Sequence, residues 1–95
     1  MTVRKIPVAI FRLGHIVATP NALQSLTQED ILTGIQRHQA GDWGDLESGD
    51  REANDRALTQ GGRIVSAYNA TNGTRFWIIT EADRSATTVL LPEDY

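Results

Sequence analysis

The last third of the chain most constrains the fold, because it reads as three short strands joined by two tight turns. Asn72 and Gly73, in the loop 69–73, tolerate the positive φ that a hairpin turn requires, and residues 82–84 form the second turn. Pro92 ends the last strand. Each strand alternates between two faces, which predicts a three-stranded antiparallel meander. The predicted strands cover residues 63–68, 74–81 and 85–91.

The beginning of the chain predicts one strand followed by a short helix. Residues 11–18 alternate weakly between apolar and polar side chains, which favours a strand. Thr19 is a suitable N-cap, and Pro20 suits the first helical position because its missing N–H has no partner there. We expect the helix to cover 20–26.

The middle of the chain predicts two further helices. Thr27, followed by an acidic residue three positions later, resembles a capping box and starts a helix that Gly41 ends. A third helix is expected over about 50–60, with Ser48 or Asp50 as its N-cap. Its inward side is expected to carry Ala53, Ala57 and Leu58.

Together these elements predict an α+β fold in a single domain, 1–95, with the order β-α-α-β-β-β. The N-terminal strand and the C-terminal meander would form one antiparallel sheet. Two to three helices would cover one face of this sheet, which gives a two-layer architecture. The other face would stay partly open.

Composition narrows the function classes. The chain has 95 residues, a net charge of −3 and no cysteine, so disulfides and thiolate chemistry are excluded. An acidic chain is not typical of duplex-DNA binders, which usually carry a basic excess. Neither a signal peptide nor a membrane-spanning run is expected, and we predict a cytoplasmic protein without membrane contact.

Four residues on or near the predicted sheet suggest a nuclease-like set. Arg63 and Arg75 could grip a phosphate, His15 could supply a general acid or base, and Glu81 completes the set. Such a set would belong to a metal-independent ribonuclease. In a simpler interpretation, these arginines occupy the solvated side of the sheet and Glu81 pairs with Arg75 or Arg84.

The loop after the second helix suggests a protein-binding site. Trp43 lies between two glycines in an acidic loop, and it either plugs the edge of the core or is offered to a partner. With Asp42, Asp45 and Glu47 it forms the candidate binding set. No metal site is expected, because the spacing of these carboxylates and Asp50 does not match a calcium-binding loop.

The remaining motif signals are weak or absent. His38 continues the apolar stripe of the second helix near its end, where we expect it to interact with the last carbonyl groups. The chain has no phosphate-binding loop, no dinucleotide fingerprint, no nucleophile elbow and no zinc-ligand spacing. We therefore expect no cofactor.

Five motifs together resemble a known family. Across about residues 11–95 the chain is similar to small bacterial proteins of unknown function, often associated with plasmids or mobile elements. Some members carry a restriction-system label, and the resemblance implies no established activity. Its topology also resembles that of ribonuclease toxins of the RelE–barnase type. The motifs are HQAGDWGD (38–45), NDRAL (54–58), GRIVSAY (62–68), WIITEADRS (77–85) and LPEDY (91–95).

Three functional hypotheses follow. The first is a non-enzymatic protein-interaction module in a plasmid, phage or defence setting, in which the acidic stretch 42–55 engages a basic surface. An inhibitor of a nucleic-acid-binding enzyme would be one such role. The second is the ribonuclease, for which nucleic acid would be the partner. The third is a small homodimeric structural subunit that pairs through a free strand edge.

Overall fold

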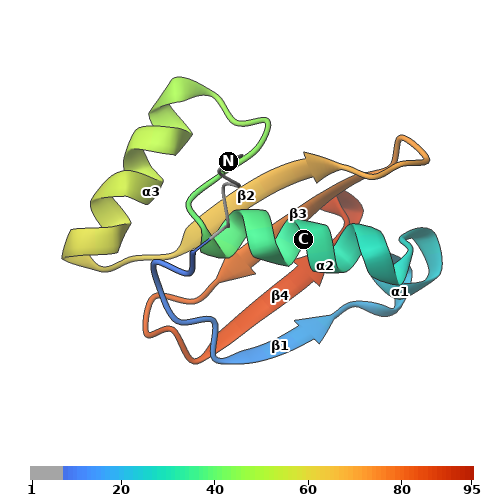
Figure 1. The fold of residues 1–95 in the computed structure, drawn as a ribbon, viewed down its shortest axis with the longest axis horizontal. Coiled ribbons are helices and arrows are strands. Elements are labelled where there is room, and N and C mark those ends of the chain that lie inside the picture. Colours follow the sequence, from blue (N-terminus) through green and yellow to red (C-terminus); the bar gives the residue numbers. More distant parts are fainter. Residues whose placement is uncertain (1–7) are drawn as a thin grey trace, which may run out of the picture.

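The computed structural model describes residues 8–95 and confirms the α+β fold and the order of its elements. Four strands form one sheet (Figure 1). Along the chain, three helices follow the first strand and precede the meander. The elements are β1 (His15–Ala18), α1 (Pro20–Ser25), α2 (Gln28–Gln39), α3 (Ser48–Gln60), β2 (Ile64–Asn69), β3 (Arg75–Thr80), β4 (Ala86–Leu90) and the 3-10 turn η1 (Pro92–Asp94).

The sheet is mixed, and this corrects the prediction that all its strands are antiparallel. Its strand order is β1-β4-β3-β2, and the antiparallel meander β2–β3–β4 is confirmed. However, β1 pairs with β4 in the parallel direction. Three helices and the strands β2 and β3 separate β1 from β4 in the chain, so no hairpin forces these two strands to run in opposite directions.

The first strand is shorter than predicted because the backbone turns at Gly14. This glycine has φ +64°, and a Cβ there would lie 2.2 Å from the carbonyl oxygen of Ser85. Only glycine tolerates that approach. Regular pairing with β4 therefore begins at His15.

The first two helices begin as predicted. The Thr19 hydroxyl accepts a hydrogen bond from the Ala22 N–H, and the Thr27 hydroxyl accepts one from the Asp30 N–H, both at 3.1 Å. These bonds satisfy N–H groups that lack partners within the helix.

The start of α3 differs from the prediction. Glu47 is its N-cap residue and makes no side-chain cap bond, so neither Ser48 nor Asp50 has that role. The buried residues of α3 are Asn54 and Ala57, whereas Ala53 is exposed. The helix therefore turns a polar side chain, and not only alanines, towards the rest of the fold.

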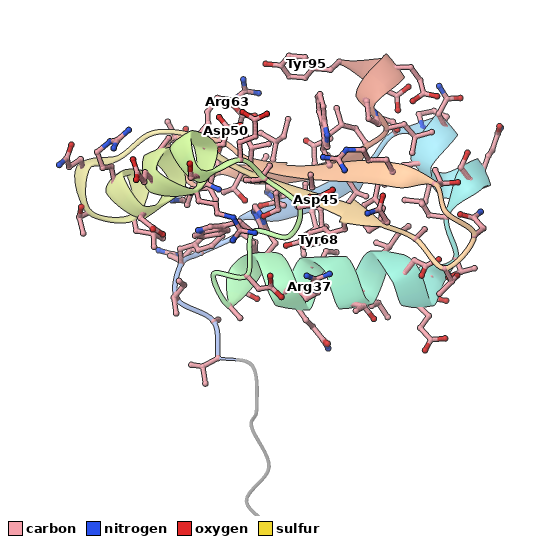
Figure 2. All side chains as sticks on the ribbon, turned by 90° about the horizontal axis from the view of Figure 1, so that it is seen from above. Arg37, Asp45, Asp50, Arg63, Tyr68 and Tyr95 are labelled. Carbon is pink, nitrogen blue, oxygen red and sulfur yellow. The ribbon has the colours of Figure 1, made fainter. Side chains whose placement is uncertain are left out.

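The main core lies between α2 and the sheet, with α1 closing one end. Figure 2 shows α2 along one side of the sheet, where it forms the second layer, and α3 outside that layer. A smaller cluster of Trp43, Ala57 and Ile64 lies where α3 meets β2. The main core cluster contains Ala22, Leu26, Tyr68, Ala70, Phe76, Ile78, Val89 and Leu91.

None of the helices within residues 8–95 is both long and apolar enough to cross a membrane.

Candidate protein-binding groove

A groove of about 520 Å³ lies between α3 and the outer face of the sheet, which is the face turned away from α2. Val65 of β2 and Trp77 of β3 line it, together with Leu46 from the loop before α3. These side chains give the groove an apolar floor. Apolar floors with a polar border are typical of surfaces that bind ligands or partners.

Asn54 holds α3 against the edge of β2. Its Nδ2 donates to the Val65 carbonyl at 2.8 Å, and its Oδ1 accepts from the Val65 N–H at 3.1 Å. One side-chain amide thus replaces both hydrogen bonds that a neighbouring strand would make at this residue. The bonds fix one wall of the groove.

The loop before α3 covers the next part of the same edge. The Ala67 N–H donates to the Trp43 carbonyl at 3.1 Å, and the Asp45 N–H donates to the Ala67 carbonyl at 2.8 Å. Gly44, with φ +76°, permits this contact, since a Cβ there would lie 2.0 Å from the Ala67 oxygen. The loop is therefore held like a short extra strand.

The groove has an acidic border formed by Asp45, Glu47 and Asp50. Two arginines also line it. Arg75 Nη1 lies 2.9 Å from the Asp45 carboxylate, and Arg75 Nη2 donates to the Asp45 carbonyl at 3.0 Å. Because exposed ion pairs are worth only about 0 to 1 kcal/mol, a bound partner can exchange them for its own charges.

The second arginine, Arg63, is engaged at the other end of the groove. Its Nε lies 3.5 Å from Glu81, and its Nη1 donates to the Tyr95 hydroxyl at 3.0 Å. The Tyr95 ring stands edge-on to Trp77 with 5.7 Å between centroids. Figure 2 shows Arg63, Asp50 and Tyr95 on the side of the sheet opposite α2.

The candidate binding set divides into two pairs of residues. Asp45 and Glu47 line the groove, as the hypothesis requires. Trp43 is 3 % exposed, and its indole N–H donates to Asp55 at 3.1 Å. It plugs the core beside α3, and it does not present the exposed ring that an anchor for a partner would need.

Asp42 fastens the loop to the body of the protein. Its carboxylate accepts two hydrogen bonds from Arg37, at 2.7 and 3.2 Å, and these lower the pKa of Asp42. Its carbonyl accepts from the Tyr68 hydroxyl at 2.6 Å. Arg37 also lies over the Tyr68 ring (Figure 2). Asp42 therefore holds the loop in place and does not line the groove.

Within residues 8–95 no three acidic or histidine side chains gather as a metal site.

The four residues of the nuclease hypothesis share the outer face but do not meet. Arg63 and Glu81 are in contact. His15 pairs with Ala86, whose carbonyl accepts from the Glu81 N–H, so one strand separates His15 from Glu81 by about 10 Å. Arg75 lies six residues along β3 from Glu81, which is about 20 Å. Arg75 is therefore too far from Glu81 for all four residues to converge on one point.

His38 is fully buried and belongs to a chain of hydrogen bonds that the sequence did not predict. Thr87 Oγ1 must donate to the Leu13 carbonyl (2.7 Å), so the Thr80 hydroxyl donates to Thr87 (2.7 Å). Thr80 then accepts from His38 Nε2–H at 2.9 Å, and Nδ1 accepts from Ser66 at 2.5 Å. This order assigns a neutral imidazole protonated at Nε2.

The expectation that His38 interacts with the last helix carbonyls is therefore wrong. Burial lowers the pKa of His38 to about 4, and the charge of Arg84 adds to this effect. Hydroxyl residues at core-facing positions of three neighbouring strands were the available signal. At neutral pH the imidazole is structural.

A scan against protein-family models finds no match for this chain. Searches of curated proteins and of solved structures likewise return no similar protein.

Proposed function

We propose that this protein is a non-enzymatic interaction module that binds a basic segment of a partner protein in the groove beside α3. The observation that carries the proposal is the combination of an apolar floor with an acidic border in one groove. Leu46, Val65 and Trp77 would cover the apolar parts of the partner. Asp45, Glu47 and Asp50 would face its lysine or arginine side chains.

The charge distribution favours a basic partner. Six of the twelve acidic residues lie between positions 42 and 55, and Arg51 is the one basic residue in that stretch. Arg51 contacts the loop before α3, because its Nε donates to the Leu46 carbonyl at 3.1 Å and its Nη2 to the Gly44 carbonyl. Two of its donors are therefore used by the loop. Complementary charge speeds association and selects the partner.

This chemistry suits an inhibitor of a nucleic-acid-binding enzyme. Such enzymes carry basic surfaces, and an acidic module competes with the nucleic acid for them. The proposed setting is the bacterial cytoplasm, in a plasmid, phage or defence context, in line with the motifs that resemble mobile-element proteins. The separation of Arg75 from Glu81 along β3 speaks against the four-residue set of the ribonuclease hypothesis.

The test uses a defined probe, a fluorescent ten-residue peptide that alternates arginine and leucine. Fluorescence anisotropy measures its binding to the full chain. We expect saturable binding that the double variant Glu47→Gln/Asp50→Asn weakens about tenfold, because it removes two border charges. Trp77→Ala should also weaken binding, through loss of the apolar floor.

A charge-matched control separates the groove from net charge. Glu29→Gln/Glu93→Gln changes the chain charge by the same amount at exposed positions outside the groove and outside the stretch 42–55, and it should leave the affinity within about twofold. Equal weakening by both double variants, or no saturable binding by the wild type, would overturn the proposal.

A further inference from the structure

The two edge strands of the sheet differ in whether their outward backbone groups have hydrogen-bond partners. Asn54 and the loop around Gly44 occupy the outer edge of β2. At the other edge, the His15 and Thr19 N–H groups donate to β4 carbonyls. Because neighbouring residues of a strand point their backbone groups to opposite sides, the N–H and C=O groups of Ile16 and Ala18 point away from β4. Within residues 8–95 they have no backbone partner beyond the sheet.

The open edge is surrounded by apolar side chains. Ile16 and Val17 on β1 are 50 % and 49 % exposed, and Leu23 follows on α1. Leu32 is exposed on the side of α2 turned away from Arg37, which faces β2. These are four of the seven exposed large apolar residues in the described part of the chain. No lysine, proline or bulge protects β1, although such devices are usual at sheet edges.

We propose that the open edge of β1 pairs with β1 of a second copy, antiparallel and centred on Val17. A two-fold axis through Val17 places Ile16 opposite Ala18 of the second copy, and the reverse. The free groups of these residues then form four backbone hydrogen bonds, and the two sheets become one of eight strands. The two copies of α2 lie on the same side, and their Leu32 side chains flank the junction.

The polar side chains beside the edge favour a second copy over an unrelated strand. In this register His15 lies opposite Thr19 of the second copy. The Thr19 hydroxyl donates to Asp94 at 2.6 Å, so a carboxylate stands at that end of β1. The His15 imidazole of each copy therefore faces the Thr19–Asp94 pair of the other, twice by symmetry. The same surface patch supplies both halves of the contact.

Light scattering coupled to size-exclusion chromatography tests the association. We expect a mass twice the chain mass of 10.5 kDa. Ile16→Lys places a charge in the new junction and should shift the protein to the chain mass. Val8→Lys, at an exposed position outside β1, is the matched control and should stay dimeric.

A disulfide tests the register. The chain has no cysteine, so Val17→Cys introduces a single thiol. Facing residues at a non-hydrogen-bonded antiparallel pair have Cα atoms about 4.5 Å apart, within the range that a disulfide spans. Under mild oxidation Val17→Cys should cross-link two chains at least about tenfold faster than Ile16→Cys, whose counterpart is one residue pair away.

Three results would overturn the proposal. The first is a wild-type protein that keeps the chain mass up to about 1 mM, because a weaker Kd would leave the edge unoccupied. The second is a dimer that survives Ile16→Lys. The third is equal cross-linking of the two cysteine variants, since it would place the contact elsewhere or in another register.

Discussion

At the scale of single residues, His38 links the stability of the fold to pH. It is the buried centre of the Ser66–His38–Thr80–Thr87 chain, and its pKa is lowered from 6.5 to about 4. As the pH falls below 6.5 the unfolded chain gains a proton at this histidine and the folded one does not. The stabilisation is therefore complete above pH 6.5 and is lost progressively as the pH falls towards about 4.

We predict that His38→Gln removes much of this pH dependence. Between pH 7.5 and 4.5 the wild-type free energy of unfolding should fall about 2 to 3 kcal/mol more than that of the variant. Urea denaturation at the two pH values measures the difference. The control His15→Gln replaces the other histidine, which is exposed. A steep fall in His38→Gln, or its loss in His15→Gln, would assign the effect to other groups.

Residue roles were only partly predictable from the sequence. Thr19 and Thr27 were identified as caps because capping depends on neighbours a few positions away. The partners of His38 lie 28 and 42 positions distant, so the one signal for them was the hydroxyl residues at core-facing strand positions. Trp43 was ambiguous for the same reason, since its burial depends on α3.

At the scale of elements, the edge of β2 depends on one side chain from α3. Asn54 both donates to and accepts from the Val65 backbone. Among residues 8–95 no other contact satisfies these two groups, and an unsatisfied buried group costs about 1 to 3 kcal/mol. The position of α3, and with it the groove wall, rests on this pair of bonds.

We predict that Asn54→Ala destabilises the fold by about 2 kcal/mol and exposes the Val65 N–H. Hydrogen exchange followed by NMR should show much faster exchange at Val65, with Ile78 in the sheet interior unchanged relative to global unfolding. Asn54→Asp keeps the acceptor and loses the donor, so Val65 N–H should stay better protected than in Asn54→Ala. Equal protection at Val65 in the wild type and Asn54→Ala would contradict this role.

The elements themselves were largely predictable, because alternation, turn residues and caps are local signals. The meander and both early helices follow from them. The direction of β1 did not follow, since a strand joined through several helices can pair either way. The inward side of α3 was only partly predicted, since Ala57 and Leu58 pack inward but Ala53 is exposed. Its buried Asn54 looks like a solvent-facing residue until the edge of β2 is placed beside it.

At the scale of the whole molecule, Asp94 ties the end of the chain to the start of α1. It accepts hydrogen bonds from the Thr19 hydroxyl at 2.6 Å, from Asn21 at 2.7 Å and from the Leu91 N–H at 3.0 Å. These bonds lower the pKa of Asp94 below 3.8. Thr19 in turn caps α1, so one carboxylate holds a strand end, a helix start and η1 together.

We predict that Asp94→Asn lowers the Tm at pH 7. Because the folded pKa is depressed, the contribution of Asp94 is present above pH 3.8 and is lost as the pH falls through the lower folded value. The Tm difference between wild type and variant should therefore shrink at about pH 3. The neighbouring Glu93→Gln, at an exposed position, serves as the control. A difference that persists undiminished in acid would contradict the charge-dependent role.

The closed border of β2 also limits how far copies of this protein can assemble. If only one margin of each molecule accepts a neighbour, a pair leaves no further site for growth. With the proposed contact at β1, assembly would stop at two copies and would not extend into fibres. Asn54 on α3 and the loop around Gly44 thus block strand addition at β2, and without them a second free edge would permit open-ended assembly.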